Sequence, residues 1–189
     1  MEPDAPEGRQ ARNMTLEAYA DTIVPGEKRW PGDRAIAGIS AGGGAVTAGA
    51  LGVLEMPEGG MAPALDDVAA ALNAHAERYQ GEHGLDPDPS VPPFVALESD
   101  DRIGLVSELT TPGHPEKELW TGLALFCYMA YDTGAHLHTA DALRDGHPGL
   151  TAMKVERPDA DGLWRFPDYS YRRPLARVHP DTTPSGSPA

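Results

Sequence analysis

The sequence predicts an all-α fold, a compact bundle of about five to six helices around one central buried helix. The central helix is expected at about 116–132, where apolar residues fall on every side of a helical wheel. A helix that is apolar all round must be surrounded by protein or by lipid. The run from Leu119 to Tyr131 is shorter than the roughly 20 residues that a membrane span needs, so we expect it inside the domain, with no membrane insertion.

Composition divides the 189 residues into four stretches. Residues 1–13 are polar and contain proline, and we expect a flexible N-terminus there. The helical domain is expected over 14–150. Residues 151–180 are rich in proline and aromatic side chains, which predicts an extended tail packed on the domain, and 181–189 are expected to be disordered.

Charge and cysteine content narrow the classes of function. A formal net charge of -14 repels phosphate backbones and anionic lipid, so neither nucleic-acid binding nor docking to an acidic membrane is expected of this acidic protein. The single cysteine, Cys127, lies in the apolar run and is expected to be a small buried hydrophobe. The N-terminal stretch shows no cleavable export signal, which predicts a cytoplasmic location.

The first helix of the domain is expected at Leu16–Val24, with Thr15 as its N-cap and the Pro25-Gly26 pair as its end. The segment Pro25–Arg34 then reads as a structured loop anchored by Trp30.

The next segment, Ala35–Leu54, is rich in glycine, and it has two alternative interpretations. A phosphate-binding loop would need a β-branched strand before it and a third glycine where Thr47 stands. We favour the other interpretation, a helix whose small face lets the backbone of a neighbour approach closely.

Two further helices precede the central one. Apolar residues recur at spacings of three and four over Met61–Gln80, with charge on the opposite face. The prolines of Gly84–Pro93 exclude regular structure. The second helix is expected to begin at Ser99 or Asp100 and to run to about Thr110.

Potentially reactive side chains concentrate after the central helix. In a continuing helix, Asp132 and His136 would share one face, while His138 would point elsewhere. The simplest interpretation is that these side chains have a structural role. The alternatives are acid–base chemistry or substrate contact by these three residues, and a metal site completed by another histidine. The residues concerned are Asp132, His136, His138, Asp141 and His147, with His114 as a further potential ligand.

The run TLEAYADTIVPGEKRWPGDRAIAG, Thr15–Gly38, resembles the opening of the small subunit, subunit 3, of gluconate 2-dehydrogenase-like enzymes. The matching stretch is Ala20–Pro25, and the whole chain is similar to a group of actinobacterial proteins related to that subunit. The resemblance implies an all-helical accessory subunit without a cofactor of its own. Its partner would be the FAD-containing large subunit of an alcohol or sugar oxidoreductase of the glucose–methanol–choline (GMC) type.

Two functions follow as expectations. The first is a noncatalytic accessory or maturation partner of such a flavoprotein, which should expose an apolar patch for its partner. The second is a stand-alone helical enzyme that tailors a small natural product in bacterial secondary metabolism, with Asp132, His136 and His138 in the wall of a closed pocket. The residues expected to bind a partner are Trp30, Trp164, Phe166, Tyr169 and Tyr171.

Overall fold

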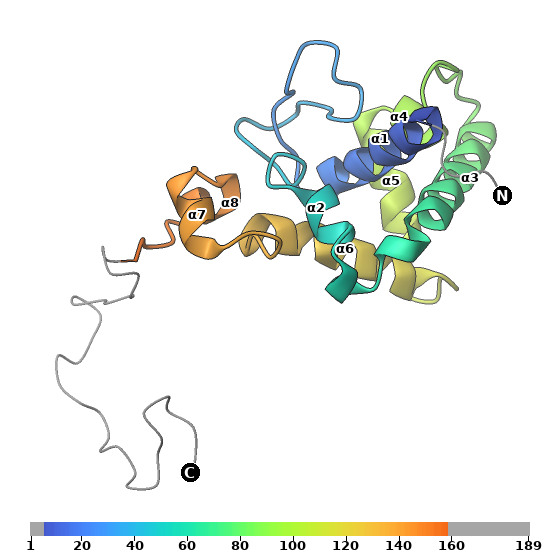
Figure 1. The fold of residues 1–189 in the computed structure, drawn as a ribbon. Helices are drawn as coiled ribbons and strands as arrows, with labels where there is room; N and C mark the ends of the chain where they lie inside the picture. Colours follow the sequence, from blue (N-terminus) through green and yellow to red (C-terminus); the bar gives the residue numbers. More distant parts are fainter. Residues whose placement is uncertain (1–5, 159–189) are drawn as a thin grey trace, which may run out of the picture. The chain divides into compact units, whose positions relative to one another are not determined.

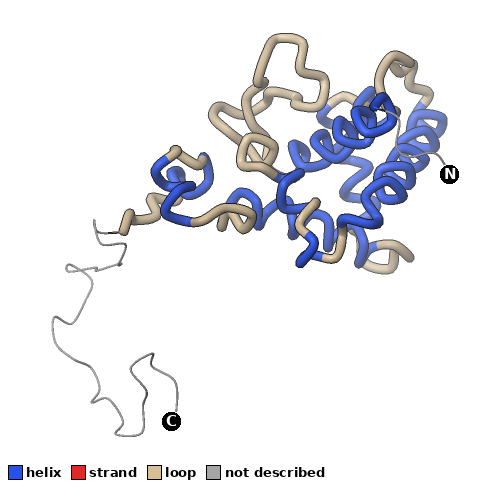
Figure 2. The backbone as a smooth tube through the Cα atoms, in the orientation of Figure 1, coloured by secondary structure: helices blue, strands red, loops and turns tan. Residues whose placement is uncertain are grey.

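The computed structural model describes residues 6–158, nearly all of which belong to one compact unit, Met1–Val155. This described part is helical and contains no strand, which confirms the predicted all-α fold (Figures 1 and 2). The tail residues 159–189 lie outside the described residues. The helices are α1 Pro6–Ile23, α2 Ala50–Leu54, α3 Leu65–His83, α4 Pro93–Ala96, α5 Ser99–Leu109, α6 Lys117–Asp132, α7 Thr139–Arg144 and α8 Pro148–Ala152, with 3-10 turns at Pro57–Gly59 and Ala62–Ala64.

The central helix α6 begins and ends within a residue of the predicted range. It packs against α2 above all, and also against α1, α5 and α8. One correction applies, because α6 is buried on one side only. Trp120, Leu123 and Cys127 are inaccessible to solvent, whereas Leu125 and Tyr128 are exposed. The burial of Cys127 agrees with the expected hydrophobic role, and burial raises the pKa of its thiol to about 12.

Aromatic side chains join the first helix to the central one. The hydroxyl of Tyr19 on α1 donates a hydrogen bond of 2.7 Å to the carbonyl oxygen of Trp120 on α6. The rings of Trp120 and of Phe94 on α4 both lie 6.3 Å from the Tyr19 ring. These large buried rings anchor a core that otherwise contains many alanines.

The first helix starts earlier than expected. α1 already begins at Pro6, so the flexible N-terminus predicted for residues 1–13 is wrong from Pro6 onward. Proline is well suited to a first helical turn because its φ is preset and its missing N–H has no intrahelical partner there. Thr15 lies inside the helix, where its hydroxyl donates to the carbonyl oxygen of Ala11, and Arg12 pairs with Glu55 at 2.6 Å.

The helix expected at Ala35–Leu54 is also wrong, since only Ala50–Leu54 is helical. Gly38, Gly42 and Gly49 have positive φ angles of 76°, 80° and 91°, which a right-handed helix does not contain. The expected close approach of a backbone does occur. A Cβ on Gly44 would lie only 2.3 Å from the carbonyl oxygen of Val24. The glycines therefore build a long loop folded back on the end of α1 (Figure 1).

The two remaining predicted helices are present as α3 and α5. Among the described residues, no helix has both the length and the apolar character that a membrane crossing requires.

Candidate functional site

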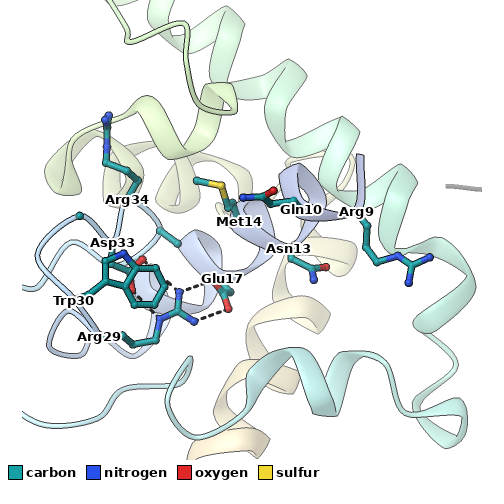
Figure 3. Close-up of a pocket in the computed structure, with 11 residues that line it drawn as sticks. Arg9, Gln10, Asn13, Met14, Glu17, Arg29, Trp30, Asp33 and Arg34 are labelled. Atoms are coloured by element: carbon teal, nitrogen blue, oxygen red, sulfur yellow. Dashed lines mark hydrogen bonds and ion pairs between the residues drawn. The ribbon is translucent and has the colours of Figure 1, made fainter. Parts of the chain in front are cut away.

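A groove of about 710 Å³ lies between α1 and the loop that follows it (Figure 3). Helix α1 contributes Gln10, Asn13 and Met14, and the loop contributes Trp30. The Trp30 side chain was expected to anchor the loop or to meet a partner. It is 54 % exposed, so it offers its ring to the surface of the groove.

A clamp centred on Arg29 holds this part of the loop against α1. The guanidinium donates to both carboxylate oxygens of Glu17, at 2.8 and 2.7 Å, and to the Asp33 carboxylate at 2.7 Å (Figure 3). It also lies 4.8 Å from the centre of the Trp30 ring, in cation–π geometry. Burial alone would raise the pKa of Asp33, but the hydrogen bonds and positive charge of Arg29, together with the backbone N–H groups of Ile36 and Ala35, outweigh it and hold that pKa below its ordinary value.

Asp21, in the Ala20–Pro25 stretch, fixes the loop at two points. Its carboxylate oxygens accept hydrogen bonds from the backbone N–H of Gly26 at 3.1 Å and of Ala37 at 2.8 Å. The side chain is 2 % exposed, and burial raises its pKa despite these hydrogen bonds. The aspartate of the motif therefore has a structural role in this chain, because it shapes the loop that carries Trp30.

A second buried charge, Arg102 on α5, holds the other side of the same loop. Its guanidinium donates to the carbonyl oxygens of Ala35 at 2.8 Å and Arg34 at 3.1 Å, and it also binds the carbonyls of Val95 and Leu97. Burial lowers the pKa of Arg102. Only arginine has enough donors in a planar fork to satisfy four carbonyl groups at once.

The structure does not bring together the residues of the expected histidine cluster. Helix α6 ends at Asp132, and Gly134, with a φ of 58°, turns the chain before His136. Asp132 and His136 therefore do not share a helix face. No hydrogen bond or ion pair joins Asp132, His136 and His138 to one another within residues 6–158.

His136 instead turns inward, toward the glycines before and within α2. A Cβ added to Gly49 or Gly52 would lie 2.3 or 2.9 Å from its ring, so the glycines make room for the imidazole. The Nδ1 atom of His136 is buried and has no hydrogen-bond partner in the described part of the chain. Burial, followed by the neighbouring His147, lowers the pKa of His136.

His147 is held on both sides of its ring. Its Nδ1 accepts from the backbone N–H of Leu150 and its Nε2 lies 3.3 Å from the carbonyl oxygen of Ala48, so both ring nitrogens have hydrogen-bond partners. His136 and His147 line a pocket of about 300 Å³ together with Asp141 and Asp145.

His138 has no place in this pocket. It precedes the first turn of α7 with a side chain that is 76 % exposed, 3.9 Å from Asp141. Across residues 6–158, no three His, Cys, Asp or Glu side chains are arranged to hold a metal ion. Of the three predicted catalytic residues, His136 lines this pocket, whereas Asp132 and His138 do not.

The sequence profile of a protein family, DUF5987, matches residues 10–189. The chain belongs to that family. It is described as a family of unknown function, and its match spans both the Trp30 groove and the histidine pocket. No curated protein and no solved structure matches the chain.

Sequence reasoning missed three residues that shape the groove of this DUF5987 chain, namely Asp21, Arg29 and Arg102. A signal for Arg102 was present, because it stands at the inward spacing of α5, three residues before Leu105 and seven before Leu109. A charged residue on the apolar face of a helix indicates a buried polar network. Four of the expected partner-binding residues, Trp164, Phe166, Tyr169 and Tyr171, lie outside the described residues.

Proposed function

We propose that this protein is a noncatalytic helical accessory subunit or maturation partner that docks on a flavin-dependent oxidoreductase of the GMC type. The flavin would belong to the partner. The observation that carries the proposal is the exposed Trp30 ring, held by the Arg29 clamp at the wall of a wide groove. The class of partner comes from the resemblance of Ala20–Pro25, the stretch that ends α1 at the base of the same loop.

The chemistry of the groove supports a protein partner. Tryptophan and arginine are the residue types that contribute most to protein–protein binding, especially where the free surface is already rigid. Arg29 is paired with Glu17 and Asp33, and Arg34 is paired with Asp88 at 2.9 Å. With these arginines neutralised, the groove offers aromatic surface and amide side chains, as the core of an interface does.

Co-expression tests the proposal. The untagged chain would be produced with each GMC-type flavoprotein of its own genome, and complexes would be isolated through a tag on the flavoprotein. We expect one flavoprotein to retain the chain in a stoichiometric complex. Replacing Trp30→Ala should weaken that complex about tenfold or more. The matched control is Ile39→Ala, which removes another exposed apolar side chain from the same loop.

Two outcomes would overturn the proposal. In the first, no GMC-type flavoprotein retains the chain. In the second, a complex forms but Trp30→Ala binds as tightly as Ile39→Ala, which would place the interface away from the groove.

One observation favours the second candidate, a small-molecule enzyme. The buried, unpaired Nδ1 of His136 beside the pocket of about 300 Å³ resembles a base kept neutral by its surroundings. Under this function His136 would move the proton, while the exposed His138 would have no part. Turnover of a small natural product by the isolated chain should disappear in His136→Gln and persist in His138→Gln. Equal activity in both variants would remove the enzyme candidate.

A further inference from the structure

Helix α6 presents an apolar stripe to solvent on the side away from the core. Leu125, Tyr128 and Met129 are 59 %, 49 % and 40 % exposed. Their spacing of three and four residues places them on one helix face. The buried residues of α6, Trp120 and Cys127 among them, lie on the opposite face, so the stripe contributes little to holding the domain together.

Unpaired acidic residues flank this stripe at both of its ends. Glu118 and Asp132 each lie seven residues, two helical turns, from Leu125 and so share its face. Both are exposed, and neither forms a hydrogen bond or ion pair with any other residue between 6 and 158. At Gly122, beside the stripe, an added Cβ would meet nothing within 4 Å, so the surface there is open.

We propose that this stripe, defined by Leu125, Tyr128 and Met129, docks into an apolar groove on a basic partner protein. The partner would carry Lys or Arg side chains at both ends of its groove, about 20 Å apart, to meet Glu118 and Asp132. An exposed helix face with anchors three and four residues apart is the pattern that such grooves recognise. The inference rests on α6 alone and is independent of the Trp30 groove.

A second copy of the chain fits this surface poorly. Antiparallel pairing of two α6 helices over the whole stripe would bring Glu118 of one copy toward Asp132 of the other, and the two carboxylates would repel each other. Each copy also carries a formal net charge of -14.

A synthetic peptide provides the test. The probe is an amphipathic helix as long as α6, with leucines along one face and lysines at both ends of that face, labelled for fluorescence anisotropy. We expect the full-length protein to bind it with a Kd in the micromolar range at low salt. The double change Leu125→Ser and Met129→Ser should weaken binding about tenfold or more. Ile103→Ser, at another exposed apolar residue on α5, should not.

The charge requirement is tested separately. Glu118→Gln with Asp132→Asn should weaken binding and reduce its dependence on salt. The charge-matched control is Glu77→Gln with Glu82→Gln, at exposed acids of α3. If both pairs of changes weaken binding equally, the peptide responds only to the overall charge of the protein, and the proposed surface is wrong.

Photo-crosslinking distinguishes the occupants of the stripe. Benzoylphenylalanine at position 128 of the full-length protein should crosslink to the peptide, and mapping by mass spectrometry would confirm the site. A crosslinked dimer would assign the stripe to a second copy. A crosslink to the protein's own chain would show that the molecule covers the stripe itself. Either of these results, or no crosslink at all, would overturn the proposal.

Discussion

His136 and His138 stand two positions apart in the sequence and meet opposite surroundings. His136 fills the space left by Gly49 and Gly52, with its Nδ1 buried and unpaired, whereas the ring of His138 lies in solvent. Burial disfavours the charged form of an imidazole. His136 is therefore expected to stay neutral at a pH at which an ordinary histidine takes up a proton.

This difference predicts a pH dependence of stability. The pKa of His136 is lowered in the folded state, while in the unfolded state it should be near 6.5. As the pH falls through about 6.5, the unfolded state binds a proton that the folded state does not, so the free energy of unfolding should fall. Urea unfolding between about pH 7.5 and pH 5.5 measures this slope.

Replacing His136→Gln should make the slope shallower, because the group that titrates differently in the two states is gone. His138→Gln, which removes an exposed histidine from the same loop, is the matched control for the loss of an imidazole. Buried Asp21, whose pKa is raised, contributes with the opposite sign, but it does so equally in all three proteins. Equal slopes for the wild type and His136→Gln would contradict the prediction.

At the scale of single residues, the sequence indicated the right region of the chain for His136 but the wrong neighbouring residues. His136 was a candidate because other titratable residues stood near it in the chain. Its actual neighbours, Gly49 and His147, come from segments that only tertiary folding brings together. Local spacing cannot show such contacts, since they depend on where α2 and α8 pack.

At the scale of elements, regular apolar spacing separated correct predictions from wrong ones. The ranges of α3 and α5 follow from this spacing, although α3 begins at Leu65 rather than at Met61. The range of α6 follows from a run that is apolar on every side, and it agrees closely with the structure. The segment Ala35–Leu54 consists mostly of glycine and alanine, so a small-faced helix and a tight loop fit its composition equally well. The loop forms because α1 ends at Ile23 and its C-terminal backbone accepts Gly44 at close range.

The close approach at Gly44 predicts opposite effects for two glycine-to-alanine changes. In Gly44→Ala, the new Cβ would lie 2.3 Å from the Val24 carbonyl oxygen. Backbone atoms can move away from such a clash only at a substantial cost in free energy. We expect a loss of about 1–3 kcal/mol in the free energy of unfolding. Gly81→Ala lies in α3, where the Cβ meets nothing within 4 Å, and should gain up to about 1 kcal/mol.

Both glycine variants would be measured by urea unfolding under identical conditions. Tryptophan fluorescence provides a second readout, since a displaced loop should change the surroundings of Trp30, one of the three tryptophans, in Gly44→Ala only. If Gly44→Ala proves as stable as the wild type, the loop does not lie against the end of α1 as described.

At the scale of the whole molecule, charges affect the stability of the fold in two opposite ways. Arginines pair with acids across the fold, as in Arg12 with Glu55, Arg29 with Glu17 and Arg34 with Asp88. Each such pair at the surface is worth only about 0–1 kcal/mol. The chain has 29 acidic and 15 basic residues, so at least 29 − 15 = 14 acids have no basic residue to balance them.

This excess decides the direction of the salt response. Salt weakens the ion pairs, which destabilises the fold, but it also screens the repulsion among the excess acids, which is stronger in the compact state than in the unfolded chain. Because repulsion involves the larger number of charges, we expect NaCl to stabilise the protein. Raising it from about 10 mM to about 150 mM shortens the screening length from roughly 30 Å to roughly 8 Å and should raise the Tm.

Charge reversal supplies the control for the salt response. Glu77→Lys with Glu82→Lys, on the exposed side of α3, lowers the net negative charge without removing any of the ion pairs named above. This variant should be more stable than the wild type at low salt and should gain less from added NaCl. A Tm that falls as NaCl is added would show that the ion pairs, with the Arg29 clamp among them, stabilise the fold more than the excess acids destabilise it.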